Sequence, residues 1–149
     1  MEFRTIHFNQ LSSIELYEIL QLREAVFHLE QACVYTDLDD KDLDAHHVIG
    51  IQDGKIHATA RLLAPGVSYD GYASIGRVCT SSKVRTKGYG RALMVKSIST
   101  CMERYPHNAI KISAQSYLLD FYSSFGFQAY GEEYFEDEIP HKGMIMKND

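Results

Sequence analysis

The spacing of apolar residues changes along the chain, and the two spacings together predict a mixed α/β fold. Residues 2–8, "EFRTIHF", alternate between two sets of side chains, as in a β-strand. In 13–30 the apolar residues recur at helical spacing, so we expect a helix that breaks near its end. Ser12 and Glu15 have the spacing of a capping box, in which each side chain accepts a hydrogen bond from the other residue's backbone N–H. The helix is therefore expected to begin directly after Ser12.

The rest of the chain predicts a hairpin followed by a crossover unit. In 46–66 two apolar runs flank Asp53-Gly54, a pair that favours a tight turn because both residues tolerate a positive φ angle. We then expect a strand at 72–81, a helix at 89–104, a strand at 109–114, a short helix at 116–125, a strand at 127–135 and a last strand within 136–147. A strand, a helix and a second strand in this order form two parallel strands with a right-handed crossover. The hairpins around this unit indicate a twisted mixed β-sheet flanked by helices.

The apolar faces of the two long helices indicate what they bury. The residues expected near one face are Leu16, Ile19, Leu20, Val26 and Phe27 in the first helix and Leu93, Val95, Ile98 and Met102 in the second. Three arginines, Arg23, Arg61 and Arg77, fall on apolar elements. They either form structural salt bridges with carboxylates such as Asp39 or Asp44, or bind substrate. The salt bridge is the favoured interpretation.

Composition limits the classes of protein and of partner. The 149 residues suit a single domain, 1–149, and a hydrophobic content of 45% is ordinary for a globular protein. A net charge of -5 argues against general nucleic-acid binding, because a phosphate backbone selects a basic surface. The N-terminus lacks the layout of a signal peptide, and no stretch approaches the ~20 apolar residues of a membrane span. We therefore expect a cytoplasmic protein with no nucleic-acid and no membrane partner.

The cysteines point to neither a disulfide framework nor a metal site. They are three in number, Cys33, Cys79 and Cys101, and they are widely spaced. No Cys-x-x-Cys pair and no His/Cys ligand spacing accompanies them. The sequence therefore predicts no metal.

One basic segment stands apart from this acidic chain. From Gly71 to Met102 there are six lysines and arginines and no acid. Within it, 85–90 is expected between the end of a strand and the start of a helix, where free N–H groups and the helix dipole attract an anion. The simpler interpretation is a solvated basic helix face. We favour an anion site, because Gly88 and Gly90 would otherwise weaken the first turn without compensation.

This loop and the segments after it resemble the GNAT superfamily of N-acetyltransferases. The family pattern is Gln/Arg-x-x-Gly-x-Gly/Ala, then a helix, a strand and a short helix ending in Tyr-x-x-x-Gly-Phe. Here the first part is Arg85, Gly88 and Gly90, and the last part is "YSSFGF" at 122–127. The segments "LQLREAVFHLEQ", "IGRV" and "IPHKGM" look like the ElaA-like branch. The resemblance spans nearly the whole chain and implies the GNAT fold, in which a splayed parallel strand pair holds acetyl-CoA.

The resemblance also implies site residues. The positions expected to contact acetyl-CoA are Val78, Cys79, Thr80, Arg85, Thr86, Lys87, Gly88, Tyr89, Gly90, Arg91, Gln115 and Tyr122. The backbone of 78–80 is expected to pair with the pantetheine arm and to polarise the thioester carbonyl. Tyr122 matches the tyrosine that acts as general acid toward the sulfur, and Gln115 replaces a frequent asparagine. Since the family transfers the acetyl group directly, Cys79 is not expected to be a nucleophile.

The sequence does not identify one residue as the general base. Glu30, His46, His47 and His141 are candidates for the base or for substrate contacts, although a lone histidine is more often structural. The acidic stretches 37–44 and 132–138 would attract a cationic amine, or they are solvated loops.

The resemblance implies an acetyl-CoA-dependent N-acetyltransferase. Its acceptor would be a primary amine of a small molecule or peptide, and the protein would be a monomer or a homodimer. The alternative is a coenzyme A-binding sensor or interaction module that lacks catalysis, and the missing base keeps this alternative open. A nucleic-acid-binding domain that uses the basic segment conflicts with the acidic remainder of the chain.

Overall fold

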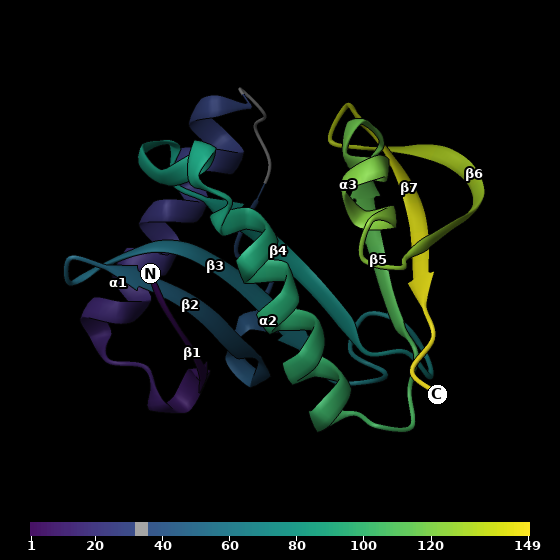
Figure 1. The fold of residues 1–149 in the computed structure, drawn as a ribbon, viewed down its shortest axis with the longest axis horizontal. Helices are drawn as coiled ribbons and strands as arrows, with labels where there is room; N and C mark the ends of the chain where they lie inside the picture. The colour runs from purple at the N-terminus through teal and green to yellow at the C-terminus, as the bar shows by residue number, and fades with distance from the viewer. Residues whose placement is uncertain (32–35) are drawn as a thin grey trace.

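The computed structural model describes residues 1–31 and 36–149, which form two β-sheets with helices packed on them (Figure 1). In chain order the elements are β1 (Glu2–His7), η1 (Phe8–Gln10), α1 (Ser13–Arg23), η2 (Glu24–Glu30), η3 (Lys41–Asp44), β2 (His46–Gln52), β3 (Lys55–Leu63), β4 (Ser74–Thr80), η4 (Ser82–Lys87), α2 (Tyr89–Arg104), β5 (Ile110–Gln115), η5 (Ser116–Leu118), α3 (Leu119–Ser123), β6 (Gln128–Glu136) and β7 (Ile139–Met146). The first sheet has the strand order β1-β2-β3-β4 and the second β5-β7-β6, and neighbours within each sheet are antiparallel.

Most local signals of the first half of the chain are confirmed. The Ser12 hydroxyl accepts from the N–H of Glu15 at 3.1 Å, and the Glu15 carboxylate accepts from the N–H of Ser12 at 2.8 Å, which completes the capping box. The helix does not break near its end as expected; from Glu24 it continues to Glu30 as the π-helical η2. Asp53 and Gly54 have φ angles of 53° and 76°, as the tight hairpin turn requires. The first strand ends at His7, because Phe8 already belongs to a 3-10 turn.

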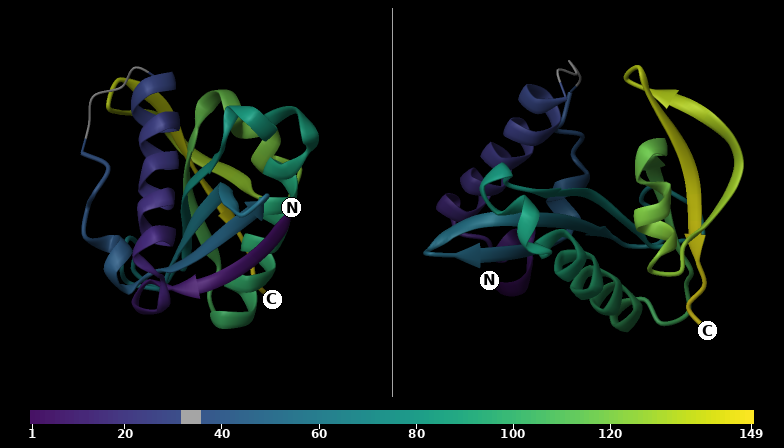
Figure 2. Two further views of the ribbon diagram at one scale, coloured as in Figure 1. Left: turned by 90° about the vertical axis from the view of Figure 1, so that its left-hand side faces the viewer. Right: turned by 45° about the horizontal axis from the view of Figure 1, so that its top comes forward.

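The expected mixed sheet consists of two antiparallel sheets that meet at one parallel bridge. Ala73, directly before β4, pairs with Ile110, the first residue of β5. The N–H of Ala73 donates to Ala109 at 3.1 Å, and the carbonyl of Ala73 accepts from Lys111 at 2.9 Å. Beyond these bonds β4 and β5 diverge, and the sheets form a V that is visible in Figures 1 and 2. The parallel strand pair of the crossover unit is therefore present, and it is splayed.

A bulge in β4 accompanies this divergence. Thr59 of β3 lies opposite Cys79, whereas Arg61 lies opposite Gly76, so β4 contains one residue more than β3 between these pairs. At Arg77 the backbone takes a φ of 49°, which is uncommon for a residue with a side chain. Bulges bend a strand and increase its twist. The bend falls in the middle of β4, next to the residues expected to meet the cofactor.

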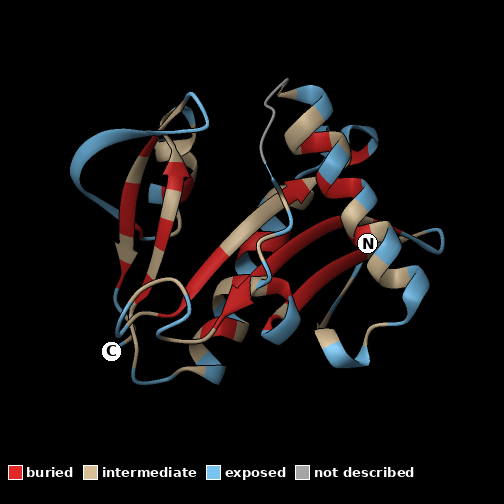
Figure 3. Ribbon diagram, turned by 180° about the vertical axis from the view of Figure 1, so that it is seen from behind, coloured by how far each residue is buried: buried red, intermediate tan, exposed pale blue. Residues whose placement is uncertain are grey.

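α1 and α2 pack on opposite faces of the first sheet, and side chains of one strand alternate between them. Toward α1 and η2, the buried cluster contains Ile19, Leu22, Val26, Ile49, Ile56 and Cys79. Toward α2, it contains Leu93, Met94 and Cys101 with Val48, Ala58 and Ala60, and it continues onto the second sheet. The alternation of Val48 and Ile49 follows from the period of two in a strand. Both faces of the central strands are therefore buried, as their colouring in Figure 3 shows.

The apolar face predicted for α2 is partly wrong. Val95 is 58% exposed, whereas Leu93, Met94, Ser97 and Cys101 are buried. Leu93, Ser97 and Cys101 are four residues apart and therefore share one face. Val95 lies two residues beyond Leu93, about 200° around the helix, and so points away from the sheet.

Helices able to cross a bilayer are lacking in the part of the chain that the structure describes, since none is both long and apolar enough.

Candidate functional site

A cleft of about 930 Å³ lies between the diverging strands β4 and β5. Nine residues selected from the sequence line it: Glu30, Val78, Cys79, Thr80, Arg85, Gly90, Gln115, Tyr122 and His141. The other residues expected at the cofactor, Thr86, Lys87, Gly88, Tyr89 and Arg91, lie on η4 and at the start of α2. His46 and His47 are on β2 and do not line the cleft. Burial lowers the pKa of His46 to about 4.

The basic loop forms one end of the cleft, and Arg85 is its centre. The Arg85 guanidinium lies 2.7 Å from the Glu30 carboxylate and donates to the Thr80 carbonyl at 2.8 Å. One candidate base, Glu30, is therefore committed to the residue expected to bind the anion. Any anion that reaches Arg85 competes with this carboxylate.

The first turn of α2 presents uncapped backbone at the same end. Gly88 is the N-cap with a φ of 78°, and among the described residues no side chain caps the turn. A Cβ atom added at Gly88 or Gly90 would meet nothing within 4 Å. The unpaired N–H groups and the positive end of the helix dipole can therefore be approached closely by an anion.

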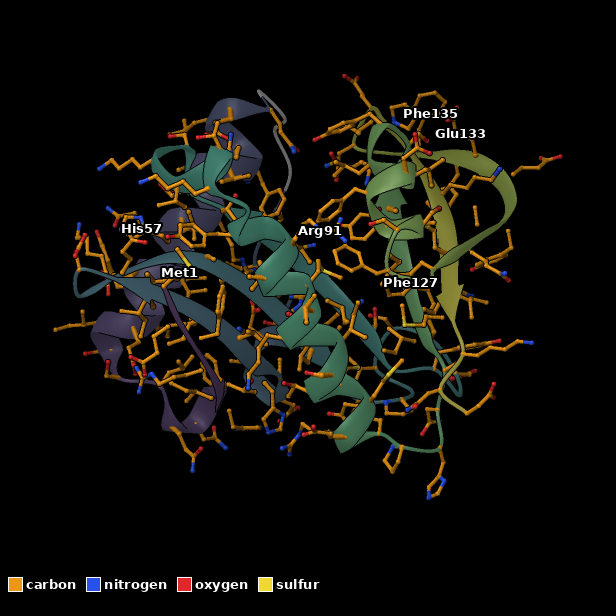
Figure 4. All side chains as sticks on the ribbon, in the orientation of Figure 1. Met1, His57, Arg91, Phe127, Glu133 and Phe135 are labelled. Carbon is orange, nitrogen blue, oxygen red and sulfur yellow. The ribbon has the colours of Figure 1, made fainter. Side chains whose placement is uncertain are left out.

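Arg91, also expected at the cofactor, contacts the C-terminal half of the chain. It donates to the Ser124 hydroxyl at 2.9 Å, and its guanidinium lies 4.5 Å from the centre of the Phe125 ring. Figure 4 shows this side chain between α2 and the C-terminal half. Arg91 thus ties α2 to the turn after α3.

Tyr122 reaches the cleft from α3. Its ring packs edge-on against Phe121 and Phe127, with ring centroids 5.2 Å and 6.2 Å away. The helix ends before Gly126, whose φ of 109° is one that L residues rarely adopt. Burial raises the pKa of Tyr122 to about 12, so its hydroxyl is a hydrogen-bond donor at neutral pH.

The described cysteines are buried thiols. Cys79 lies in β4 at the cleft, and burial raises its pKa to about 12. Burial raises the pKa of Cys101, in α2, to about 12 as well. A thiol with such a pKa is not ionised at neutral pH and is a poor nucleophile. Cys33 lies outside the described residues.

Gln115 spans the cleft and carries an unsatisfied atom. Its amide nitrogen donates to the Gln31 side chain at 3.3 Å, which links the end of β5 to the residue after η2. Its carbonyl oxygen is buried and has no hydrogen-bond partner among the described residues. A buried acceptor without a donor is costly, so this oxygen marks a place where a bound molecule can donate a hydrogen bond.

His141 lies on β7 at the other wall and is 8% exposed. Its Nδ1 is 2.7 Å from the Ile139 carbonyl oxygen. Because a carbonyl only accepts, Nδ1 carries the proton, and Nε2 of the neutral ring presents a lone pair. Nε2 lies 3.6 Å from a carboxylate oxygen of Glu136, and the ring stacks on Tyr134.

Ser113 and Glu136 also line this wall, and Tyr134 lies in contact with Ser113; none of the three was expected from the sequence. Ser113 lies on β5, and its hydroxyl is 3.1 Å from Glu136 and 2.5 Å from the Tyr134 hydroxyl. The three residues meet because β5 and β6 both flank β7. The only sequence signal was the acidic stretch 132–138, which contains Glu136.

The three arginines on apolar elements form structural salt bridges, as favoured from the sequence. The pairs are Arg23 with Asp37 and Asp42, Arg61 with Asp39 and Asp42, and Arg77 with Asp37 and Asp39. The expected partner Asp44 is wrong, because Asp44 is exposed while Asp42 is buried. The 3-10 turn η3 places these two residues, two positions apart, on different faces.

Within residues 1–31 and 36–149, no group of three or more histidine, cysteine, aspartate or glutamate side chains is placed to hold a metal ion.

Comparisons with known proteins agree with this geometry. Residues 19–148 match the model of the acetyltransferase (GNAT) domain family. Protein ElaA of Escherichia coli K12 is 40% identical over an alignment of 149 positions that covers 99% of this chain and 97% of that protein. The crystal structure of an acyl-CoA N-acyltransferase from Pseudomonas aeruginosa has a TM-score of 0.92 and 38% identity, covering 99% of this chain and 100% of that chain. The crystal structure of Escherichia coli ElaA has a TM-score of 0.91 and 39% identity, covering 98% and 99%.

These matches extend over nearly the whole chain, and the structural matches include its fold. The family uses an acyl-CoA as co-substrate. The chain therefore belongs to the GNAT acetyltransferase family, is an acyltransferase, and is similar to ElaA.

Proposed function

We propose that residues 1–149 act as one N-acetyltransferase domain that moves an acetyl group from acetyl-CoA directly to a primary amine of a small molecule or peptide. The observation that supports this most is a single cleft lined by a tyrosine hydroxyl, an oriented histidine and a basic loop. Acetyl-CoA, when bound, supplies an activated thioester. The residues of this chain bind it, orient the amine and move the protons.

The cleft fits such a ligand at several points. Arg85 and the first turn of α2 suit the pyrophosphate, since they offer a cation and N–H donors at one place. The Gln115 carbonyl oxygen can accept from an amide N–H of the pantetheine arm. β4 is the last strand of its sheet, so an extended ligand at Val78–Thr80 can pair with its backbone as a further strand would.

We propose Tyr122 as the general acid. A model thiol ionises near pH 8.5, so proton transfer from a tyrosine with a pKa of about 12 to a free thiolate would be uphill. Tyr122 therefore donates its proton while the carbon–sulfur bond is breaking. It regains a proton from the acceptor nitrogen as the amide forms, and the atoms and charges balance.

We propose His141 as the general base. Its Nδ1–H is held by the Ile139 carbonyl, which leaves Nε2 to accept a proton in the cleft. Glu30 was an equal candidate from the sequence, but its carboxylate lies on Arg85 at the anion end. Tyr122, on α3, then protonates the sulfur, and His141, on β7, accepts a proton from the amine.

The first prediction tests the cofactor and the reaction together. Acetyl-CoA should raise the melting temperature, since a ligand at a hundred times its dissociation constant stabilises a fold by about 2.7 kcal/mol. Gly90→Val should reduce this shift, because its side chain enters space that is open at the anion end. Lys96→Ala, an exposed position farther along α2, is the control and should keep the shift.

Thiol release is then measured with butylamine, cadaverine, glycine amide and Nα-acetyl-lysine amide. We expect acetyl-CoA-dependent release with at least one of them. An unchanged melting temperature at millimolar acetyl-CoA contradicts the proposed co-substrate. A clear thermal shift without release for any amine supports the coenzyme A-binding module instead.

A further inference from the structure

We propose that Glu136 binds the acceptor as an ammonium ion, and that the acceptor is therefore a cationic primary amine. This inference rests on the proposed N-acetyltransferase function and adds a binding residue and a substrate class to it. It starts from four polar side chains on the C-terminal sheet: Ser113, Glu136 and His141, which line the cleft, and Tyr134, which contacts them.

A chain of hydrogen bonds fixes the direction of the Glu136 carboxylate. Ser113 has one hydroxyl proton, and the carboxylate oxygen Oε1 at 3.1 Å can only accept. The serine proton is therefore directed to Glu136, and the Tyr134 hydroxyl at 2.5 Å donates to the serine oxygen. Ser113 thus donates to Oε1, and Tyr134 in turn donates to Ser113, while Oε2 is the carboxylate oxygen that lies toward His141.

Oε2 of Glu136 and Nε2 of His141 form a pair that needs a donor between them. They lie 3.6 Å apart. Nδ1 holds the proton of the neutral ring, so two acceptors face each other. An ammonium group carries several N–H donors and a positive charge, and it can satisfy both acceptors at once. The competing interpretation is a second proton on His141, which would make the pair an ordinary structural salt bridge.

The opposite wall of the cleft, in its described part, offers carboxylates that are paired with arginines, and Glu30 lies 2.7 Å from Arg85. Its aspartate Asp39 is paired with Arg61 at 2.8 Å and with Arg77 at 3.4 Å. Lys41 is the lysine on that wall, and its ammonium donates to the Ser68 hydroxyl at 2.9 Å. The acids that line the C-terminal wall are Glu136 and Asp137; Glu136 lies against His141, and its side chain is 51% exposed, so it can meet an incoming cation.

Binding at this place also prepares the amine for reaction. The ammonium gives one N–H proton to Nε2 of His141, which leaves a neutral amine and an imidazolium. The imidazolium is stabilised by Glu136 on one side and by the Ile139 carbonyl on the other. The amine lone pair is then free to attack the thioester, and the proton passes through the exposed edge of the site to water.

The second prediction compares Glu136→Gln with a matched control. Glu133→Gln removes the same charge from the same strand, but Glu133 contacts Ser116 and not His141. Figure 4 labels Glu133, which lies on β6 of the C-terminal sheet. In steady-state kinetics with the four amines above, Glu136→Gln should raise KM for the amine about tenfold, because it removes a charge-assisted hydrogen bond. Most of the loss in kcat/KM should lie in KM, and Glu136→Asp should recover part of it.

The outcomes are separable. An unchanged KM in Glu136→Gln together with a lowered melting temperature shows a structural salt bridge and contradicts the inference. Equal changes in Glu136→Gln and Glu133→Gln contradict it as well, because the effect would then be one of overall charge. Failure of the parent protein to release thiol with any amine contradicts the proposed function itself, which the acetyl-CoA thermal shift tests independently.

Discussion

At the scale of single residues, burial gives Cys79 and Tyr122 opposite roles in the same cleft. Burial raises the pKa of both groups to about 12. For the thiol this removes the nucleophilic thiolate, which agrees with direct transfer. For the phenol it preserves a proton that can be donated. Burial therefore keeps the Cys79 thiol un-ionised and unreactive, and it keeps the Tyr122 hydroxyl protonated.

The third prediction concerns the Tyr122 hydroxyl. Tyr122→Phe keeps the ring contacts with Phe121 and Phe127 and removes only the donor. General acid catalysis is worth roughly 10²–10⁴-fold, and we expect about 100-fold because the raised pKa weakens the acid. The measurement is a single-turnover rate, so that product release does not hide the chemical step.

Tyr117 supplies the control for this experiment. It also lines the cleft, but it is 73% exposed, so Tyr117→Phe should keep the rate within about twofold. Acetyl-CoA affinity should be similar in both variants. If Tyr122→Phe turns over as fast as the parent, Tyr122 is a packing residue and water supplies the proton.

The sequence predicted those site residues that belong to a short contiguous pattern. Arg85 and Gly88 lie in one loop, and Tyr122 stands at a fixed place in "YSSFGF", so neighbouring letters reveal them. Ser113 and Glu136 could not be found in this way. They are 23 positions apart and meet only through the pairing of β5 and β6 with β7.

At the scale of elements, buried ion pairs fasten the acidic segment 37–44 to α1, β3 and β4. Arg23 is 1% exposed, and its guanidinium lies 2.7 Å from Asp42. Burial alone would raise the pKa of Asp42, but hydrogen bonds and charge from Arg23 and charge from Arg61 lower it below 3.8. The pKa of Asp39 is lowered in the same way by Arg61 and Arg77, against the effect of its burial.

The fourth prediction follows from these lowered pKa values. A carboxylate with a lowered folded pKa stabilises the fold above its unfolded value, near 3.8, and this stabilisation is lost as the pH falls below it. Asp42→Asn should reduce the free energy of unfolding at pH 7 by about 3 kcal/mol, since it leaves a buried arginine short of a partner. Urea denaturation measures this free energy. As the pH falls below 4, the variant should lose less stability than the parent protein does.

Asp44→Asn is the matched control. Asp44 lies two residues away in η3 and is exposed, so its substitution should change the free energy of unfolding by less than about 0.5 kcal/mol. Similar losses for Asp42→Asn and Asp44→Asn would mean that the buried pair with Arg23 does not fasten the segment.

Most elements could be predicted within one or two residues, because apolar periodicity and turn residues are local. The helix expected at 89–104 is α2, Tyr89–Arg104, and the hairpin turn lies at Asp53-Gly54 as expected. The division into two sheets could not be predicted from apolar periodicity, and only the resemblance to the family implied that the strand pair is splayed. It coincides with a bulge at Arg77, where the backbone has a positive φ angle. A glycine at this position would have indicated such a conformation in the sequence, whereas an arginine does not.

At the scale of the whole molecule, the two sheets are joined at the closed end of the V and bridged at the open end. At the closed end, backbone hydrogen bonds flank Ala73, and the Lys111 ammonium lies 4.6 Å from the Tyr69 ring centre and 5.2 Å from that of Tyr130. At the open end, Gln31 and Gln115 meet across the cleft at 3.3 Å. Arg91 and Ser124 also join the two halves, at 2.9 Å. Each side-chain hydrogen bond is worth only about 1 kcal/mol, so the contact between Gln31 and Gln115 can yield to an entering ligand.

The fifth prediction measures this difference by hydrogen exchange. β3 has a strand on either side, whereas β4 ends its sheet. Amides of β4 that face the cleft should therefore exchange faster than those of β3, and acetyl-CoA should slow them if it pairs with that edge. Equal protection of the two strands, or no change on adding acetyl-CoA, contradicts this description of the cleft.

The splayed strands also bear on the colloidal behaviour of the protein. β4 and β5 each present an open strand edge, and such edges are templates on which other chains aggregate. Here the two edges face each other inside a slot rather than outward, so an arriving molecule cannot lie flat against either. The fold thus keeps the edges of β4 and β5 available to a slender ligand and less accessible to other proteins, whereas β1 and β6 are the outer edge strands of the two sheets.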